Sequence, residues 1–461
     1  MTSEGASAEG RLARRITPGL LLALVVGNVL GAGIYVVVGE VAADVGGAVW
    51  VAFAIAFCVA GVSALTLCEL VTKYPGASGV ALYVDRAFGR PLLTFAVGVA
   101  VLASGLTSAA TAARAFGGDY LAEFWSVEPV LAAGVFVGLL AALNYWGVVE
   151  SLRANVVMTA IELAGLAIVI VAAVLIVGEG GGDVSRAIEF GDGDVIVPVA
   201  LLGGAAVAFF AFLGFEDVAN MSEEVRRPRV AYPRALFVGL ALVAVVYLAV
   251  ALAAVIAVGP DRLSGSSGPL LAVVEESPLG VGTRLFALIA LVAVANTALA
   301  NLVMGSRLLY GMAGQGLMPS PLGMVDPRRA TPWVAVVSTG LLAFVLAATG
   351  DLAGLARTTV LLLLSVLLLM NLSALRLRRD TVPHEHLTAP AWAPWLGAGL
   401  CLLLLVNQLA TGGWVDPARA AAIVALGAAL HWMRSRRRGG GGGPAPEPGR
   451  SAAGGGGRRA G

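Results

Sequence analysis

The chain has 461 residues, of which 58% are hydrophobic and only 13% are charged, and its mean hydropathy is +0.88. Soluble domains are typically about 25% charged and about 45–50% apolar, so this composition excludes a soluble enzyme, a disordered chain and a disulfide-stabilised secreted module. The net charge of +1 carries no information about partners, and we expect none among nucleic acids. Instead, the sequence predicts an all-α polytopic membrane protein.

Twelve transmembrane helices are predicted, because apolar runs long enough to cross about 30 Å of hydrocarbon recur along the chain. The first follows a polar tail of residues 1–15 and is expected to stay uncleaved, since it is too long for a signal peptide and no Ala-x-Ala site closes it. Residues 439–461 are nearly all Gly, Ala, Pro, Glu and Arg and predict a disordered tail. The predicted helices are 17–40, 47–72, 90–116, 129–147, 153–178, 196–220, 233–258, 283–312, 333–349, 352–375, 393–411 and 417–433.

The basic residues predict the orientation. With a cytoplasmic N-terminus, 24 of the 30 Lys and Arg fall on the cytoplasmic side, as the positive-inside rule requires. We therefore expect a multi-pass protein of the cell membrane with both termini in the cytoplasm. The six on the outside are Arg114, Arg186, Arg262, Arg284, Arg357 and Arg419.

No cofactor or metal site is predicted. The three cysteines, Cys58, Cys68 and Cys401, lie in or beside apolar segments without paired spacing, which favours small buried side chains. His384 and His386 are too isolated to count as a metal site.

Two predicted helices contain signs of a break at membrane depth. Helix 1 carries Gly27, Gly31 and Gly33 near its centre, and helix 6 carries Gly214 followed by two acids. Unwound backbone is tolerated at that depth only where it lines a cavity or is buried in protein. Helix 1 alone is equally well explained by close Gly-xxx-Gly packing, but interrupted segments in both halves indicate a transporter built from inverted repeats. Broken helix ends offer N–H groups to a carboxylate and carbonyls to an ammonium, which favours an amino acid as substrate.

The sequence resembles the amino acid–polyamine–organocation (APC) superfamily of permeases. The matching motifs follow one another in order from about residue 16 to residue 335. Each motif alone would be weak evidence, but together they are specific to the superfamily. It implies a LeuT-like 5+5 inverted repeat with broken helices 1 and 6, in a core of residues 16–380 followed by helices 11–12 in 381–438. The matching stretches are Gly31–Tyr35, Glu69–Gly89, Ser222–Ala235, Ser306–Ala313, Gly316–Pro319 and Thr331–Pro332.

The resemblance also implies a substrate site. The substrate carboxylate would lie on the amides near Ala32, Gly33 and Ile34, and the ammonium would meet carbonyls near Leu30, Phe210, Ala211 and Leu213. Phe210 occupies the position of the family's aromatic gate, although an ordinary core or lipid contact is the alternative. Helix 3 near Gly105 would form another wall. The complete predicted set is Leu30, Gly31, Ala32, Gly33, Ile34, Gly105, Phe210, Ala211, Leu213 and Gly214.

Two membrane acids are candidates for proton coupling. Glu162 lies ten residues into helix 5, about 15 Å along its axis and so near mid-bilayer, where an ionisable group is usually functional or neutral. Some proton-coupled members of the superfamily have a lysine at the matching position, and this chain departs from them. The alternative is a permanently protonated acid hydrogen-bonded to helix 1 or 8. Glu216, beside Asp217, would either sense protons or steady the broken helix, while Asn296 and Thr297 of helix 8 are expected to face helix 1.

These observations predict a secondary active transporter that moves amino acids by alternating access, driven by protons. No phosphate-binding Gly-x-x-x-x-Gly-Lys loop and no catalytic constellation is present, so ATP-driven transport and an enzyme are excluded. An amino acid exchanger and a polyamine transporter remain open, although a polycation would need more acids near the site. A non-transporting amino acid sensor is the alternative from another class.

Overall fold

The computed structural model describes residues 16–75, 79–146, 151–189, 197–219, 225, 228–315, 317–329 and 331–439. The predicted N-terminal tail, all but the first residue of the predicted C-terminal tail and most of the loop at 220–227 lie outside these residues. The prediction of an all-α chain is confirmed, since no strand occurs in the described part.

Within the described residues, ten helical spans are long and apolar enough to cross a membrane. The first of these spans comprises two helices, α1 (Pro18–Leu30) and α2 (Gly33–Val45). Two further helices are α14 (Trp333–Thr349), which is apolar but shorter, and α17 (Val415–Gly439). The other nine spans contain α3 (Val49–Lys73), α5 (Pro91–Phe116), α7 (Pro129–Trp146), α8 (Ser151–Gly178), α9 (Val197–Phe209), α10 (Pro228–Val258), α13 (Thr283–Gly314), α15 (Leu352–Leu377) and α16 (Trp392–Thr411).

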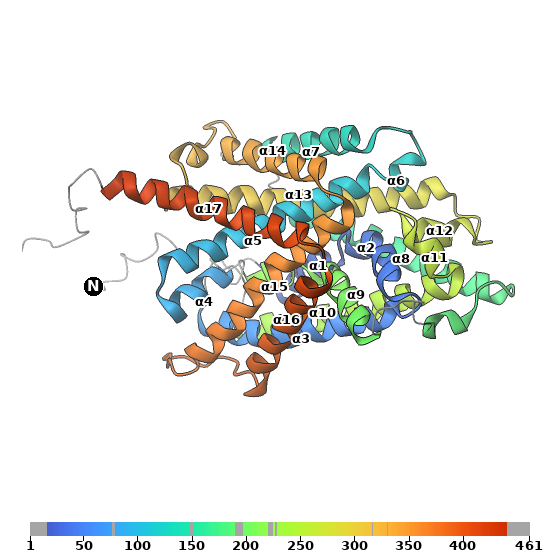
Figure 1. Ribbon diagram of the computed structural model, residues 1–461, viewed down its shortest axis with the longest axis horizontal. Coiled ribbons are helices and arrows are strands. Elements are labelled where there is room, and N and C mark those ends of the chain that lie inside the picture. The colour runs from blue at the N-terminus through green and yellow to red at the C-terminus, as the bar shows by residue number, and fades with distance from the viewer. Residues whose placement is uncertain are drawn as a thin grey trace, which may run out of the picture.

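Short helices, which the sequence analysis did not predict, connect the long ones. Four of them lie at the two ends of the bundle, with α4 at one end and α6, α11 and α12 at the other (Figure 1), whereas η2 follows α9 inside the bundle. These elements are only a few residues long, so they carry no membrane-length apolar run. Their bounds are α4 Gly79–Phe88, α6 Asp119–Ala122, η1 Val184–Ile188, η2 Phe210–Phe212, α11 Pro260–Ser264, α12 Pro269–Glu275 and η4 Ser320–Gly323.

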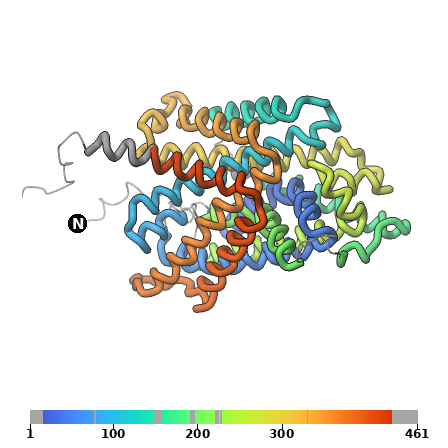
Figure 2. Tube along the Cα trace, in the orientation of Figure 1, coloured from blue at the N-terminus to red at the C-terminus, as the bar shows by residue number. Residues whose placement is uncertain are grey.

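The long helices run roughly along one direction, and α7 and α14 lie together along one edge, next to α13 (Figure 1). The chain trace in Figure 2 shows the connection between α15 and α16 at the same end as α4, whereas residues 260–276 lie at the opposite end. The first span is the most enclosed. In its most apolar stretch 83% of residues are buried, against 33% for Pro129–Trp146. The centre of the fold is therefore built around α1 and α2.

Hydrogen bonds at Asp119 connect α6 to residues 266–268 at the end of the bundle opposite α4, and this contact is called the joint at Asp119 below. Asp119, at the start of α6, accepts hydrogen bonds through Oδ2 from the Ser266 hydroxyl at 2.7 Å and from the Ser267 and Gly268 amides at 2.8 and 3.2 Å. The Asp119 amide in turn donates to Ser267 Oγ at 2.9 Å. The segment between α11 and α12 is thereby fastened to α6, the helix that carries Tyr120.

Candidate functional site

The first span is interrupted at Gly31 and Ala32, where the sequence predicted a break. Alpha-helical geometry stops at Leu30 and resumes at Gly33. Neither flanking glycine has room for a side chain, because a Cβ on Gly31 would lie 2.3 Å from Thr297 Oγ1 and one on Gly33 would lie 2.4 Å from Ala211 Cα. The glycines therefore allow both unwinding and close contact with other helices.

The second interruption follows α9. The chain continues through the 3-10 turn η2 and a series of turns that ends at residue 219. Gly214 has a φ of +104°, a conformation that a residue with a Cβ rarely adopts, and its own Cβ would lie 2.6 Å from the Asn28 carbonyl oxygen. Together with the Gly33–Ala211 contact, this brings the two interruptions directly against each other.

Side chains of other helices already partner the free backbone groups of the first interruption. Thr297 Oγ1 on α13 accepts the Ala32 N–H at 2.6 Å. The Tyr247 hydroxyl on α10 lies 2.7 Å from the Val29 carbonyl oxygen and 2.8 Å from that of Leu30, and its proton is donated between them. The predicted amide at Ala32 and carbonyl at Leu30 are thus polar groups that hydroxyl groups of other helices occupy in this structure.

A chain of hydrogen bonds connects this region to helix α8. The Tyr120 hydroxyl donates to the Tyr35 carbonyl at 2.8 Å, and the Tyr35 hydroxyl donates to the Glu162 carbonyl at 2.7 Å. Both tyrosine side chains are fully buried. The backbone at Glu162 is therefore tied to the second half of the first span.

Glu162 itself is fully buried. Its Oε1 accepts a hydrogen bond from Asn296 Nδ2 at 3.0 Å, whereas its Oε2 has no partner among the described residues. No ion pair with a described Lys, Arg or His compensates the carboxyl group either. A carboxyl group with one unpartnered oxygen in an apolar setting can bind a proton or a small cation.

The remaining predicted residues surround the two interruptions. Ile34, Phe210 and Ala211 are buried, and Leu213 and Gly214 are partly exposed. Gly105 on α5 faces Asn301 of α13, whose Oδ1 would lie 3.3 Å from a Cβ on this glycine. Asn301 Nδ2 in turn donates to Ser108 Oγ at 3.2 Å. Glu216 is partly exposed, and its Oε2 accepts the Gly214 N–H at 3.1 Å.

Four polar residues near the interruptions were not predicted: Tyr35, Tyr120, Tyr247 and Asn301. For a tyrosine within a long apolar helix such as α10, the only local indication in the sequence is the polar hydroxyl group itself. The sequence does not show which backbone group this hydroxyl contacts. Thr297, by contrast, contacts the first span as expected, whereas Asn296, which was expected to face the same span, donates its hydrogen bond to Glu162 on α8.

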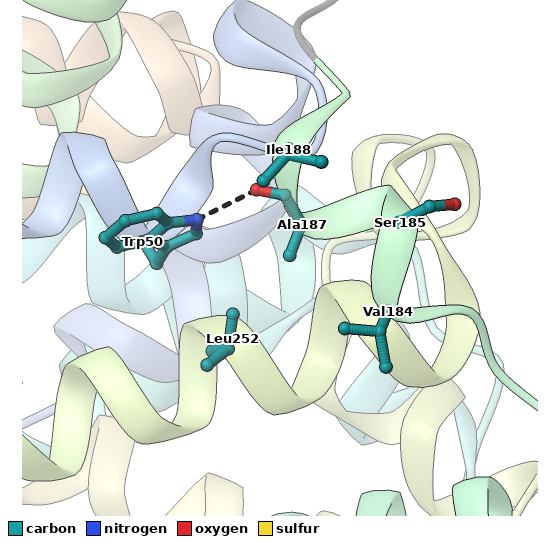
Figure 3. A pocket seen from close by; sticks show the side chains of 6 residues that line it. All are labelled: Trp50, Val184, Ser185, Ala187, Ile188 and Leu252. Atoms are coloured by element: carbon teal, nitrogen blue, oxygen red, sulfur yellow. Dashed lines mark hydrogen bonds between the residues drawn. The ribbon is translucent and has the colours of Figure 1, made fainter.

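Two cavities lie elsewhere. One, of about 360 Å³, is lined by Trp50, Leu252 and four residues of the segment 184–188, and the Trp50 indole donates to the Ala187 carbonyl at 2.8 Å (Figure 3). The other, of about 350 Å³, lies at the Lys73 end of α3. Neither includes a residue of the interruptions. Within the described part of the chain, no group of three or more His, Cys, Asp or Glu side chains could hold a metal ion.

Comparison with known proteins identifies the class. Residues 21–430 match the family model described as amino acid permease. The chain is 29% identical over 430 residues to an uncharacterized transporter of Mycobacterium tuberculosis, covering 92% of each chain. It is 30% identical over 416 residues to the vacuolar cationic amino acid transporter 2 of Arabidopsis thaliana, covering 85% of this chain and 63% of that one. It is also 23% identical over 453 residues to the branched-chain amino acid permease BcaP of Bacillus subtilis, covering 93% and 95%.

The chain therefore belongs to the amino acid permease family, within the APC superfamily. It is a transporter of the permease type and not an enzyme.

Proposed function

We propose that this permease is a secondary active transporter that moves amino acids across the cell membrane by alternating access, coupled to protons. The observation that carries the proposal is the contact between two helix interruptions at Gly33–Ala211 and Gly214–Asn28. Helices broken at membrane depth form the substrate sites of transporters built from inverted repeats. We accordingly propose twelve transmembrane helices with a LeuT-like 5+5 repeat, in which the first and sixth helices are broken.

In the proposed site, the start of α2 receives the substrate carboxylate. The amides at Gly33 and Ile34 belong to the first turn of that helix, where N–H groups have no partner within the helix. The Ala32 amide is bonded to Thr297 Oγ1, so a carboxylate that binds this amide replaces or joins the hydroxyl group. The ammonium group is received by carbonyl oxygens at Leu30, Phe210, Ala211 and Leu213. Gly31, Gly105 and Gly214 allow neighbouring segments to approach these carbonyls closely.

The proposed orientation places both termini in the cytoplasm. It rests on the distribution of Lys and Arg along the sequence, because the predicted topology assigns 24 of them to the cytoplasmic side and six to the other. In this orientation residues 260–276 and the joint at Asp119 lie on the outer face.

Glu162 is the proposed proton-binding residue, and Glu216 is a second candidate. Glu162 has the free oxygen and the apolar setting that reversible protonation requires, and Asn296 holds its other oxygen. The hydrogen bond from Gly214 to Glu216 favours a role in stabilising the second interruption.

The proposal is tested with purified protein in liposomes. Uptake of a panel of labelled amino acids is measured with and without an inward proton gradient, and with unlabelled amino acid preloaded. Uptake that follows the proton gradient is the expected result. Uptake that requires preloaded substrate would replace symport by exchange, and binding without any uptake would indicate a sensor. No uptake or binding of any panel member, with uptake of a polyamine, would overturn the choice of substrate.

Glu162→Gln tests the coupling residue. The amide keeps the shape of the side chain but cannot bind a proton, so proton-driven uptake should fall at least tenfold while substrate binding changes less than about threefold. The measurement is uptake against imposed pH gradients, together with a thermal-shift titration of substrate. Glu179→Gln is the matched control, because Glu179 is exposed and lies just after the same helix. An unaltered pH response in Glu162→Gln would remove this residue from coupling.

A further inference from the structure

A second cavity with charged walls lies at the end of the bundle that carries α4. It has a volume of about 350 Å³, opens to the surface and is lined by the last turn of α3, the end of α15 and the connection from α15 to α16. Its walls include Glu69, Lys73, Arg378, Asp380 and His386. None of these residues belongs to the proposed substrate site or to the coupling residues.

The two acids of this cavity are already partnered. Glu69 Oε2 forms an ion pair with Arg378 Nη2 at 3.2 Å and accepts the Ala389 N–H at 3.0 Å. Asp380 Oδ2 accepts the Tyr74 hydroxyl at 2.5 Å. Both carboxylates are therefore neutralised or hydrogen-bonded within the wall.

The basic residues Lys73 and Arg378, by contrast, have N–H donors that make no hydrogen bond within the described part of the chain. Lys73 is only 3% exposed, and its ammonium group donates to the Leu377 carbonyl at 2.7 Å. No described carboxylate lies within 4.0 Å of that nitrogen. The ammonium group has three donors, so this bond uses only one of them. Arg378 Nε is also buried without a partner in the described part of the chain. A buried ammonium group without a counterion is costly, and an acceptor group in the cavity would relieve that cost at Lys73, whereas Arg378 already pairs with Glu69.

The position of the cavity indicates where the acceptor comes from. Arg378 Nη2 also donates to the carbonyls of Ala389 and Pro390, which fixes the end of the connection just before α16. That helix begins with Trp392 and Trp395, which are 53% and 67% exposed. Exposed tryptophans at the start of an apolar helix are typical of the interface between headgroups and hydrocarbon. The cavity therefore lies at the level of lipid phosphates.

We propose that this cavity is a binding site for a phosphate group, held by Lys73 and Arg378 and supplied by an anionic lipid headgroup or by free phosphate. Basic pockets between transmembrane helices on the cytoplasmic side bind anionic headgroups in other membrane proteins. A phosphate oxygen at Lys73 occupies the donors left over from the bond to Leu377.

Lys73 also caps the end of α15 through its bond to Leu377. Capping by a basic side chain stabilises the last carbonyls of a helix, and a residue that only caps would leave lipid binding unaltered on substitution. Phosphate binding and helix capping by Lys73 thus predict different effects of its substitution on lipid binding. Transport is not used as a readout, so this proposal and the proposed function can fail independently.

The test is native mass spectrometry of the full chain after delipidation, titrated with phosphatidylglycerol or with phosphatidylcholine. Wild type should bind phosphatidylglycerol preferentially, and Lys73→Gln should weaken that binding by about tenfold, as expected for one charge-assisted hydrogen bond. Lys73→Arg should retain it. Thr388→Glu places a negative charge on the exposed part of the cavity wall without touching the Lys73–Leu377 bond, so it should weaken binding even if Lys73→Gln fails to fold.

The matched control is Arg379→Gln, which removes an exposed charge next to the cavity from a residue outside its walls. It should change binding less than twofold. A parallel thermal-shift titration with inorganic phosphate distinguishes the sources: stabilisation of wild type but not of Thr388→Glu, without lipid selectivity, would assign the site to free phosphate. No selectivity and no phosphate effect would overturn the proposal, as would equal losses in Thr388→Glu and Arg379→Gln.

Discussion

The two helix interruptions meet in space but are stabilised in opposite ways. At the first, the free polar groups of Ala32 and Leu30 are satisfied by Thr297 and Tyr247, which lie on helices α13 and α10. At the second, the partners are local: the Gly214 amide donates to Glu216 two residues away, and the Leu213 amide donates to the Phe210 carbonyl. Among the described residues, the hydrogen bonds of the first interruption therefore come from other helices, whereas those of the second are made within its own segment.

Their burial differs in the same sense. Residues 31–39 are all buried, while Leu213, Gly214, Glu216 and Asp217 are partly exposed. A backbone shift in the first interruption breaks hydrogen bonds to two other helices. A shift in the second one disturbs packing contacts, such as those of the Phe212 ring with Phe53 and Tyr247, but the hydrogen bonds described for it are local. We expect substitutions at the first interruption to be the more damaging, and the three below are ordered by expected effect.

The largest effect is expected from Gly33→Ala. The new methyl group would lie 2.4 Å from Ala211 Cα, a backbone atom that cannot move without separating the two interruptions. Overpacking of this kind typically costs about 1–3 kcal/mol and occasionally more, so both thermal stability and uptake should be lost. Gly61→Ala on α3 is the control, since its Cβ would meet nothing within 4 Å and should leave both unchanged. A stable, active Gly33→Ala protein would show that the contact is loose.

A smaller loss is expected from Tyr247→Phe, which removes the hydroxyl group but keeps the ring. The Val29 and Leu30 carbonyls would lose their shared donor, at a cost of about 1–3 kcal/mol for a buried unsatisfied group. The melting temperature should fall and substrate affinity should change, because the Leu30 carbonyl becomes free. Tyr310→Phe, on an exposed tyrosine, provides the comparison. Equal melting curves for the two variants would contradict the dependence of the first interruption on α10.

The smallest effect is expected from Glu216→Gln. An amide oxygen can still accept the Gly214 N–H, so local stabilisation persists and the stability change should stay below about 1 kcal/mol, as for an ordinary neutral hydrogen bond. Thermal shift and uptake at fixed pH are the measurements. A loss as large as that of Tyr247→Phe would mean that the charge of Glu216, and not its geometry, maintains the second interruption.

The sequence predicted the position of both interruptions because glycines at membrane depth are visible in a single chain. It also placed Thr297 towards the first span and identified Glu162 as a membrane acid. The hydrogen bonds of the Tyr247 hydroxyl group could not be predicted, because its acceptors lie more than 200 residues away in the sequence. In addition, the helix is apolar on all sides, so its sequence does not show which side faces the first span. The short helices α6, α11 and α12 were not predicted for a different reason, since four to seven residues are too few to show a periodic pattern of apolar residues.

The joint at Asp119 has a thermodynamic consequence. Asp119 fastens residues 266–268 to α6, and its neighbour Tyr120 bonds Tyr35, whose hydroxyl bonds the backbone at Glu162. If movement of residues 266–268 alters this chain of hydrogen bonds, the affinity of Glu162 for a proton differs between the two positions of that segment. Reciprocity then requires protonation of Glu162 to shift the equilibrium between those two positions by the same free energy. The position of residues 266–268 and the protonation state of the buried carboxyl group are then thermodynamically coupled.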